Sequence, residues 1–135
     1  MEGVIGIDST VFMYLLAEDR RYLARVERLL SDVRDGKING IFSCIGLIEL
    51  LTGPKKRGQY DIASRYREII GQFPHLSIRG LNERIVDLAS TLRAEYGLRT
   101  PDAIHIATAI DGGAIAFVTN DRRLKKVKEI RIDLL

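Results

Sequence analysis

Cysteine is nearly absent from the sequence, as are long apolar runs and glycine-rich phosphate-binding motifs. The one cysteine, Cys44, excludes an intramolecular disulfide and is typical of a protein from a reducing compartment. No apolar stretch approaches the roughly 18–20 residues that span a bilayer, and the opening MEGVIGID has no basic segment of the kind that starts a signal peptide. We therefore expect a cytoplasmic protein without a membrane segment. Neither GxGxxG nor GxxxxGKS or GxxxxGKT occurs, which argues against dinucleotide and NTPase sites.

The composition is that of a soluble globular protein, with 46% hydrophobic and 29% charged residues. At 135 residues the chain is long enough to bury most of the surface that its unfolded form exposes. This length also fits one domain of ordinary size, so we expect a single domain over residues 1–135.

Strand and helix patterns alternate along the chain. Short apolar runs predict strands over residues 4–8, 38–43, 75–81, 114–120 and 129–135. Amphipathic or apolar segments that end at glycine or proline predict helices over residues 9–18, 19–36, 44–54, 61–73, 82–97 and 100–113, with a loop at 55–59 and a short helix or turn at 121–127. This alternation indicates an α/β fold in which a parallel sheet has helices on both faces.

Four acidic residues each stand alone in an otherwise uncharged, largely apolar stretch. They are Asp8 in VIGIDSTVFMYLLA, Glu49 in IFSCIGLIELLTG, Asp102 in TPDAIHIATAI and Asp121 at the end of AIAFVTND. Burying even an uncharged polar group without a partner costs roughly 2–7 kcal/mol, so four such carboxylates suggest one shared compensating group. Mg²⁺ or Mn²⁺ is the obvious candidate, because hard cations take carboxylate oxygen ligands. Asp8 and Asp121 end predicted strands, where parallel sheets collect ligands.

Structural roles are the alternative for each acid. Asp8 and Asp121 each follow a strand and could cap the next helix. Asp102 follows a threonine and a proline, so it could be an acid in the first turn of a helix that the threonine caps. Glu49 has no basic residue three or four positions away to pair with it. One shared site explains all four positions with a single cause.

Outside the four acids, basic side chains outnumber acidic ones. Of the 18 acidic residues, 14 remain against 21 basic ones, and a basic exterior around an acidic pocket suits a polyanionic substrate. The candidate RNA contacts are Arg122, Arg123, Lys125, Lys55 and Lys56. A merely solvated surface is the alternative for both basic clusters.

Polar residues beside the acids are candidates for supporting roles. Ser9 and Asn120 could bond a water on the cation or the scissile phosphate, although helix capping by Ser9 or Thr10 is an equally good explanation for that serine. His105 lies three residues after Asp102 on the same face of a predicted helix. The alternative to acid–base catalysis is that His105 is a buried core side chain.

The segments IDSTVFMYLL, SCIGLIELLTG, RTPDAIHIATAI and FVTNDRRL, in this order and spacing, resemble a PIN domain, and within that family the VapC-type toxins of prokaryotic toxin–antitoxin pairs. The resemblance covers nearly the whole chain. It implies a five-stranded parallel sheet with helices on both faces, a Mg²⁺- or Mn²⁺-dependent ribonuclease, a homodimer and an antitoxin that blocks the site. It also implies that Asp8, Glu49, Asp102 and Asp121 form the catalytic set. The metal ligands would be Asp8, Asp102 and Asp121, supported by Thr119.

Other functions stay open on the sequence. A PIN nuclease of RNA processing or decay would have the same site without an antitoxin. A phosphatase or phosphotransfer domain would need a second acid close to Asp8, where the chain has Ser9 and Thr10. A non-catalytic RNA-binding module would not need a complete set of four acids. We therefore expect metal-dependent hydrolysis of RNA phosphodiester bonds.

Overall fold

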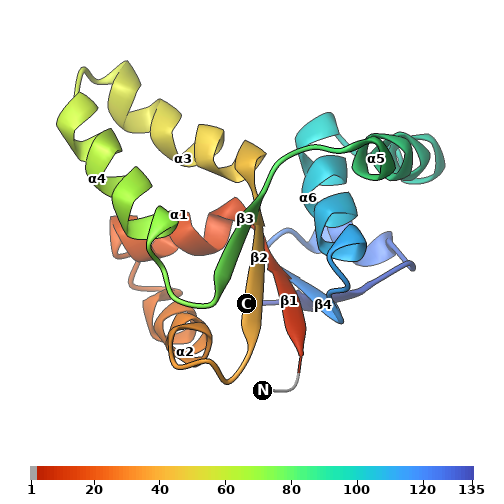
Figure 1. The fold of residues 1–135 in the computed structure, drawn as a ribbon, viewed down its shortest axis with the longest axis horizontal. Coiled ribbons are helices and arrows are strands. Elements are labelled where there is room, and N and C mark those ends of the chain that lie inside the picture. Colours follow the sequence, from red (N-terminus) through yellow and green to blue (C-terminus); the bar gives the residue numbers. More distant parts are fainter. Residues whose placement is uncertain (1–2) are drawn as a thin grey trace.

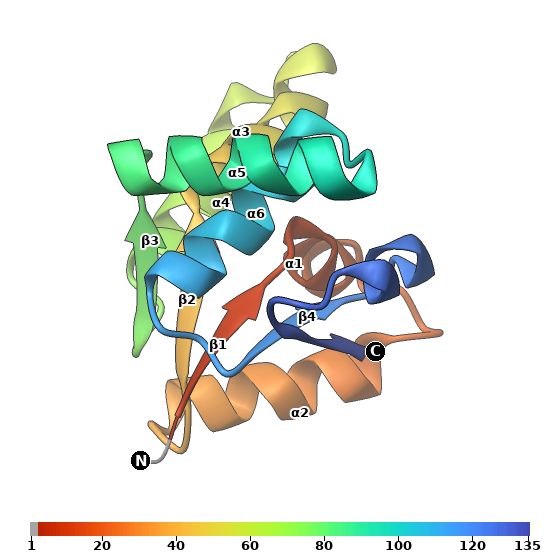
Figure 2. The same cartoon turned by 90° about the vertical axis from the view of Figure 1, so that its right-hand side faces the viewer.

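The computed structural model describes residues 3–135, so the first two residues of the expected domain, 1–135, lie outside the described residues. Within that range, five parallel strands form one sheet in the order β3-β2-β1-β4-β5 (Figures 1 and 2). The strands are β1 Val4–Ile7, β2 Asn39–Ser43, β3 Leu76–Arg79, β4 Ala116–Thr119 and β5 Arg131–Leu134. The helices are α1 Ser9–Ala17, α2 Leu23–Arg34, α3 Cys44–Lys56, α4 Tyr60–Gly71, α5 Glu83–Tyr96, α6 Thr100–Asp111 and the 3₁₀ helix η1 Arg122–Lys126. The expected α/β fold with a five-stranded parallel sheet is confirmed.

Helices cover both faces of the sheet, as predicted. In Figure 1, α1 to α4 lie on one side of the strands and α5 and α6 on the other. Each side has its own buried apolar cluster, one built around Phe12, Val26 and Phe42, the other around Leu92, Ile106 and Phe117. Within residues 3–135, no helix is both long and apolar enough to cross a bilayer.

The central strand β1 is packed tightly on both faces. Its Ile5 and Ile7 side chains join the cluster of α1 and α2, with 4% and 1% of their surface exposed. On the other face Gly6 pairs with Phe117 of β4, and a Cβ atom at Gly6 would clash with the Cβ atom of Ala109 on α6. Glycine is therefore required at this position because α6 crosses directly over the strand.

The order of strands reverses beside β1. The chain builds β2 and β3 on one side of β1 and then returns to build β4 and β5 on the other. In parallel sheets, ligands bind beyond the carboxyl ends of the strands at such a point. Asp8 lies there, directly after β1, and its backbone N–H donates to the carbonyl of Val118 in β4 at 3.0 Å.

Most helix boundaries lie within two residues of the prediction, and two differences have a clear physical reason. The helix expected over 19–36 begins only at Leu23, because the Asp19 carboxylate accepts bonds from the backbone N–H and the guanidinium of Arg21 and so stabilises a turn. The helix expected over 44–54 continues through Pro54 to Lys56. A proline removes only one backbone bond, and here it does so within the last turn. Lys55 and Lys56 are therefore helical and do not belong to a loop.

The caps expected from Thr100 and from Ser9 or Thr10 are wrong, whereas Asp8 does take the N-cap position that was its alternative role. The residue in the N-cap position of α6 is Arg99 rather than Thr100, and that of α1 is Asp8 rather than Ser9 or Thr10. Neither Asp8 nor Arg99 makes a side-chain cap bond. Asp8 and Ser9 are instead bonded by residues from other elements, Thr119 and Glu49, whereas the Thr10 hydroxyl has no hydrogen-bond partner within residues 3–135.

Candidate active site

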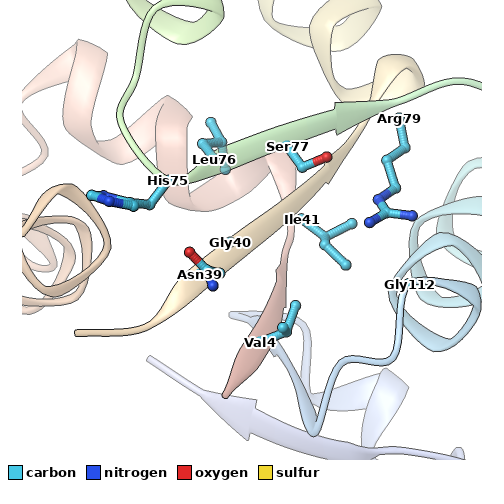
Figure 3. A pocket seen from close by; sticks show the side chains of 9 residues that line it. All are labelled: Val4, Asn39, Gly40, Ile41, His75, Leu76, Ser77, Arg79 and Gly112. Atoms are coloured by element: carbon cyan, nitrogen blue, oxygen red, sulfur yellow. The ribbon is translucent and has the colours of Figure 1, made fainter. Parts of the chain in front are cut away.

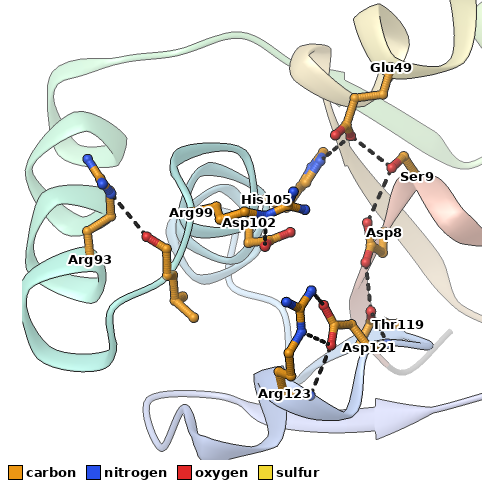
Figure 4. Close-up of polar contacts among 11 residues, drawn as sticks. Asp8, Ser9, Glu49, Arg93, Arg99, Asp102, His105, Thr119, Asp121 and Arg123 are labelled. Carbon is orange, nitrogen blue, oxygen red and sulfur yellow. Dashed lines mark hydrogen bonds and ion pairs between the residues drawn. The ribbon is translucent and has the colours of Figure 1, made fainter.

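The four isolated acids come from four different elements and face one edge of the sheet (Figure 4). Asp8 directly follows β1, and Asp121 follows β4 by two residues. Glu49 lies in the second turn of α3, and Asp102 in the first turn of α6. The connections after parallel strands return to the same edge, which is why residues 113 positions apart in the sequence meet here.

Asp8 is the buried member of the set, with 5% of its surface exposed. The hydroxyl of Thr119 donates to its Oδ2 atom at 2.6 Å, and the hydroxyl of Ser9 lies 3.4 Å from Oδ1. Burial raises the pKa of the Asp8 carboxyl, and the negative charges of Asp102 and Glu49 raise it further, against the opposing effect of the Thr119 bond. The site is therefore one in which a nearby positive charge is favourable.

Glu49 is held by two donors from other helices. The hydroxyl of Ser9 donates to its Oε1 atom at 2.8 Å, and Nε2 of His105 donates to the same atom at 2.7 Å. Burial alone would raise the pKa of Glu49, but the bonds from His105 and Ser9 outweigh it and lower the pKa. The Glu49 side chain is 32% exposed, so its second oxygen can meet solvent.

Thr119 connects the two strand ends. Its hydroxyl donates to Asp8 at 2.6 Å and accepts the backbone N–H of Asp121 at 3.0 Å, and the residue is fully buried. A hydroxyl can do both because it has one hydrogen and two lone pairs. Thr119 therefore fixes the Asp8 carboxylate relative to the loop that carries Asp121.

Two arginines pair with the remaining acids. Nε of Arg99 lies 3.3 Å from Oδ2 of Asp102, while Arg123 donates to Asp121 through Nε at 3.0 Å and through a terminal nitrogen at 2.7 Å. The bond from the Arg123 guanidinium lowers the pKa of Asp121. Asp121 also accepts the Arg123 backbone N–H at 3.0 Å, so it does cap η1, which was its alternative role.

Only one of the four acids is buried, contrary to the expectation for all four. The side chains of Glu49, Asp102 and Asp121 are 32%, 15% and 23% exposed. They lie at the open edge where helices and loops leave the sheet, so water reaches them. Their apolar sequence neighbours belong to the opposite faces of the same helices and strands.

A cation site of carboxylate oxygens fits these residues in chemistry, although each acid is bonded to protein partners in this structure. Within residues 3–135, no three histidine, cysteine or acidic side chains are grouped closely enough to hold a metal ion as they stand. The donors nevertheless are of the type that Mg²⁺ and Mn²⁺ take. The raised pKa of Asp8, due to burial and to Asp102 and Glu49, is the electrostatic condition that a cation relieves.

The predicted RNA contacts lie in two places. Arg122 and Lys125 are exposed on η1 beside Asp121, and Lys125 donates to the carbonyl of Ile132 at 3.2 Å. Lys55 and Lys56 occupy the last turn of α3, about 9 Å or more along the helix from Glu49 at 1.5 Å per residue. The structure therefore brings the first pair to the acids and leaves the second at the far end of α3.

Asn120 turns toward α1. Its amide donates to the hydroxyl of Tyr14 at 2.9 Å, and the Tyr14 ring stacks on Tyr22 with centroids 4.5 Å apart. This contact anchors the loop between β4 and η1. The expected role of Asn120 beside a cation or phosphate stays a prediction.

The sequence did not reveal the contact that His105 makes with Glu49. The side chain is 3% exposed, and its Nδ1 atom has no hydrogen-bond partner within residues 3–135, yet Nε2 bonds Glu49. The spacing of Asp102 and His105 did place both on one helical face, but no pattern pointed to Glu49, 56 residues away. Arg99 was also missed, although it stands three residues before Asp102, a spacing at which helical side chains meet.

A separate cavity of about 340 Å³ lies on the sheet away from the four acids (Figure 3). It is lined by Val4, Gly40, His75, Arg79 and Gly112, among others. The residues Val4 and Gly40 belong to the first halves of β1 and β2, whereas the acids follow the strand ends. None of the four acids lines this cavity, so it is distinct from the candidate active site.

Comparison with known proteins identifies the family. The PIN domain model matches residues 5–130, which is nearly the whole chain, so the protein belongs to the PIN domain family. The resemblance noted in the sequence is thereby confirmed. A comparison with curated proteins gives no match.

Similar solved structures share the fold over almost their full length. VapBC2 from Rickettsia felis, bound to a promoter DNA fragment, is 17% identical with a TM-score of 0.78, and the alignment covers 97% of this chain and 98% of that one. A toxin–antitoxin complex from Klebsiella pneumoniae is 22% identical with a TM-score of 0.72, covering 96% and 95%. VapC20 from Mycobacterium tuberculosis is 14% identical with a TM-score of 0.70, covering 95% and 98%.

Proposed function

We propose that this protein is a metal-dependent endoribonuclease that hydrolyses RNA phosphodiester bonds, with residues 1–135 as a single PIN-like domain. The observation behind the proposal is that Asp8, Glu49, Asp102 and Asp121 come from four separate elements and face one edge of the sheet (Figure 4). Membership of the PIN domain family supports it. A basic exterior around these acids suits a polyanionic substrate.

In the proposed site, Asp8, Asp102 and Asp121 would hold Mg²⁺ or Mn²⁺. When bound, such a cation activates water at neutral pH and offsets charge on the leaving oxygen. Glu49, which is bonded by Ser9 and His105 rather than by an arginine and is 32% exposed, would orient the attacking water.

The supporting residues keep this arrangement in place. Thr119 holds the Asp8 carboxylate, and Ser9 lies between Asp8 and Glu49. His105 acts on Glu49 and is therefore a positioning residue. Arg122 and Lys125 on η1 would bind RNA phosphates at the rim of the site.

We further propose that the protein is the cytoplasmic toxin of a toxin–antitoxin pair. The similar structures include toxin–antitoxin complexes, and VapC20 is described as a toxin that cleaves the sarcin–ricin loop. An apolar groove of about 240 Å³ beside Glu49 is lined by Met13, Leu16, Leu50 and Tyr66, which suits an apolar antitoxin helix. A guanidinium from the same segment would bridge two of the carboxylates in a planar fork.

A homodimer is part of the same proposal. Leu81, just before α5, and Val86, in its first turn, are 50% and 58% exposed and line an apolar groove together with Ile104. Light scattering of the purified protein should give twice the monomer mass. A monomer at micromolar concentration would count against the dimer and leave the nuclease proposal intact.

The deciding experiment for the activity is RNA cleavage with and without chelation. Purified protein should cleave structured RNA in its single-stranded or loop regions in Mg²⁺ or Mn²⁺, and EDTA should abolish the cleavage. Asp8→Asn, Glu49→Gln, Asp102→Asn and Asp121→Asn should each lower the rate strongly, whereas Asp61→Asn, an exposed acid in the first turn of α4, should not. Cleavage that persists in EDTA, or in Asp8→Asn, would overturn the proposal.

The partner is tested by coexpression. The product of the neighbouring gene should form a stable complex with the protein and abolish cleavage. Binding that is equally tight to a protein lacking all four acids would show that the partner does not use the site.

A further inference from the structure

Two arginines form ion pairs with acids that the proposed function assigns to the cation. Arg99 lies against Asp102, and Arg123 forms a two-point contact with both carboxylate oxygens of Asp121 (Figure 4). All four residues line one cavity of about 60 Å³ at the edge of the sheet. The guanidinium groups therefore take up the carboxylate oxygens from which a cation site would be built.

The exposure of these pairs makes them exchangeable. The arginine side chains are 71% and 72% exposed, whereas Asp102 and Asp121 are 15% and 23% exposed. An exposed ion pair gains little over its separated and hydrated partners, because water screens the attraction and the long side chain loses freedom. A divalent cation carries twice the charge and is compact, so it can displace the guanidinium groups without opening the core.

The two acids that have no arginine partner are held differently. Asp8 and Glu49 are bonded by Ser9, Thr119 and His105, which reach them through hydroxyl and imidazole hydrogens. Among the four acids in residues 3–135, the ones that form ion pairs with arginine are Asp102 and Asp121. The two arginines are therefore suited to compete with a cation for these two carboxylates.

We infer that Arg99 and Arg123 exchange partners during the reaction cycle, pairing with Asp102 and Asp121 in the cation-free protein and with RNA phosphates once a cation holds those carboxylates. This inference rests on the proposed function. Released guanidinium groups lie at the rim of the site, and their planar set of N–H donors matches phosphate oxygens. Arg123 thus raises the cation concentration that is needed to fill the site. Once the site is filled, Arg123 binds the RNA substrate.

The chain supplies a matched control for Arg123. Arg122 is the preceding residue of η1, is exposed, and carries the same charge. Arg122→Gln removes that charge from the same turn without freeing a carboxylate oxygen. A difference between Arg123→Gln and Arg122→Gln therefore measures how the Arg123 guanidinium competes with the cation for Asp121, and not the overall positive charge of the η1 segment.

The first test is Mn²⁺ affinity, measured by electron paramagnetic resonance of the free aqueous ion, with no RNA present. Arg123→Gln should tighten Mn²⁺ binding by about twofold to fivefold, the upper value corresponding to about 1 kcal/mol, the usual limit for an exposed pair. Arg122→Gln should leave the affinity nearly unchanged, and Arg123→Lys should lie between wild type and Arg123→Gln, because a lysine lacks the planar fork. Equal effects of both glutamine variants, or weaker Mn²⁺ binding by Arg123→Gln, would overturn the inference.

The second test is RNA affinity in a Glu49→Gln background, which leaves the proposed metal ligands intact. Fluorescence anisotropy would compare labelled RNA binding in Mn²⁺ and in EDTA. Adding Arg123→Gln should weaken binding in Mn²⁺ and lower the salt slope by about 1, and it should have a much smaller effect in EDTA. An effect of the same size in both conditions would mean that Arg123 does not change partners.

These outcomes separate the inference from the proposed function. If wild-type protein binds no Mn²⁺, or if Asp8→Asn binds it as well as wild type does, the proposed site itself is wrong. If Asp8 is needed for Mn²⁺ binding and RNA is cleaved but Arg123→Gln matches Arg122→Gln, only the exchange of partners fails.

Discussion

Replacement of Asp8 by asparagine should stabilise the cation-free protein at neutral pH. Asp8 is 5% exposed, and burial together with the charges of Asp102 and Glu49 raises the pKa of its carboxyl. Ionised aspartate is therefore disfavoured in the folded state relative to the unfolded chain. Asparagine has nearly the same shape and carries no charge, so the substitution removes this penalty along with any metal binding through that carboxylate.

The size of the effect follows from two opposing changes. The bond from Thr119 to Asp8 becomes one between neutral groups, which costs roughly 1 kcal/mol. Relief of the buried charge is worth several kcal/mol per ion in the general case. The net gain should be on the order of 1–2 kcal/mol, and each kcal/mol raises the melting temperature of a domain of this size by about 3–5 °C.

Thermal scans in EDTA at several pH values check the prediction. Because the folded-state pKa of Asp8 is raised above the unfolded value of 3.8, wild-type stability is lost as pH rises through the folded pKa, and the gap to Asp8→Asn should close as pH falls toward 3.8. Asp102→Asn breaks the pair with exposed Arg99 and removes a charge that repels Asp8, two small opposing effects, so it should stay within about 0.5 kcal/mol of wild type. An Asp8→Asn protein less stable than wild type at pH 7.5, or a gap that widens in acid, would refute the reasoning.

Two further substitutions test the hydrogen bonds and the packing that position the site. Thr119→Val should lower stability by about 1–3 kcal/mol, because it leaves Asp8 and the Asp121 N–H without the hydroxyl they share, whereas Thr119→Ser should restore most of it in urea unfolding. Gly6→Ala should cost roughly 1–3 kcal/mol or prevent folding through its clash with Ala109. Gly71→Ala, with nothing within 4 Å of the added Cβ, is the control, and an equal loss from both glycine variants would contradict the packing argument.

The fold could be predicted almost completely from the sequence. Each strand is a short apolar run between helical segments, and that alternation admits few arrangements other than a parallel sheet with helices on both faces. The errors lie at helix ends, where local turns and the small cost of a terminal proline, rather than the hydrophobic period, decide where the helix begins or ends. The Asp19–Arg21 turn delays the start of α2, and α3 continues past Pro54 because one missing bond in its last turn costs little.

The candidate site could be predicted only in part. The isolation of Asp8, Glu49, Asp102 and Asp121 from other charges predicted that they would lie at one edge of the sheet, and Figure 4 shows them there, while their catalytic role stays a prediction. Their partners could not be identified, because pairs such as Glu49 with His105 depend on how α3 and α6 cross in space. The degree of burial was also wrong for three of the four, because an apolar neighbourhood in sequence does not fix which face of a helix meets solvent.

The partners divide the site into two halves with different electrostatic consequences. Hydroxyl donors from Ser9 and Thr119 and the imidazole of His105 orient the carboxylates of Asp8 and Glu49, and neither acid has an arginine partner. Arginines bring a full positive charge to Asp102 and Asp121 at the exposed edge. Asp8 is the most buried acid, has a raised pKa due to burial and has no arginine partner, so in the proposed site it is the acid that would gain most from a cation. Such a cation would then compete for Asp102 and Asp121 only against ion pairs with exposed arginines, so the order in which the carboxylates become available would follow from the partner of each acid.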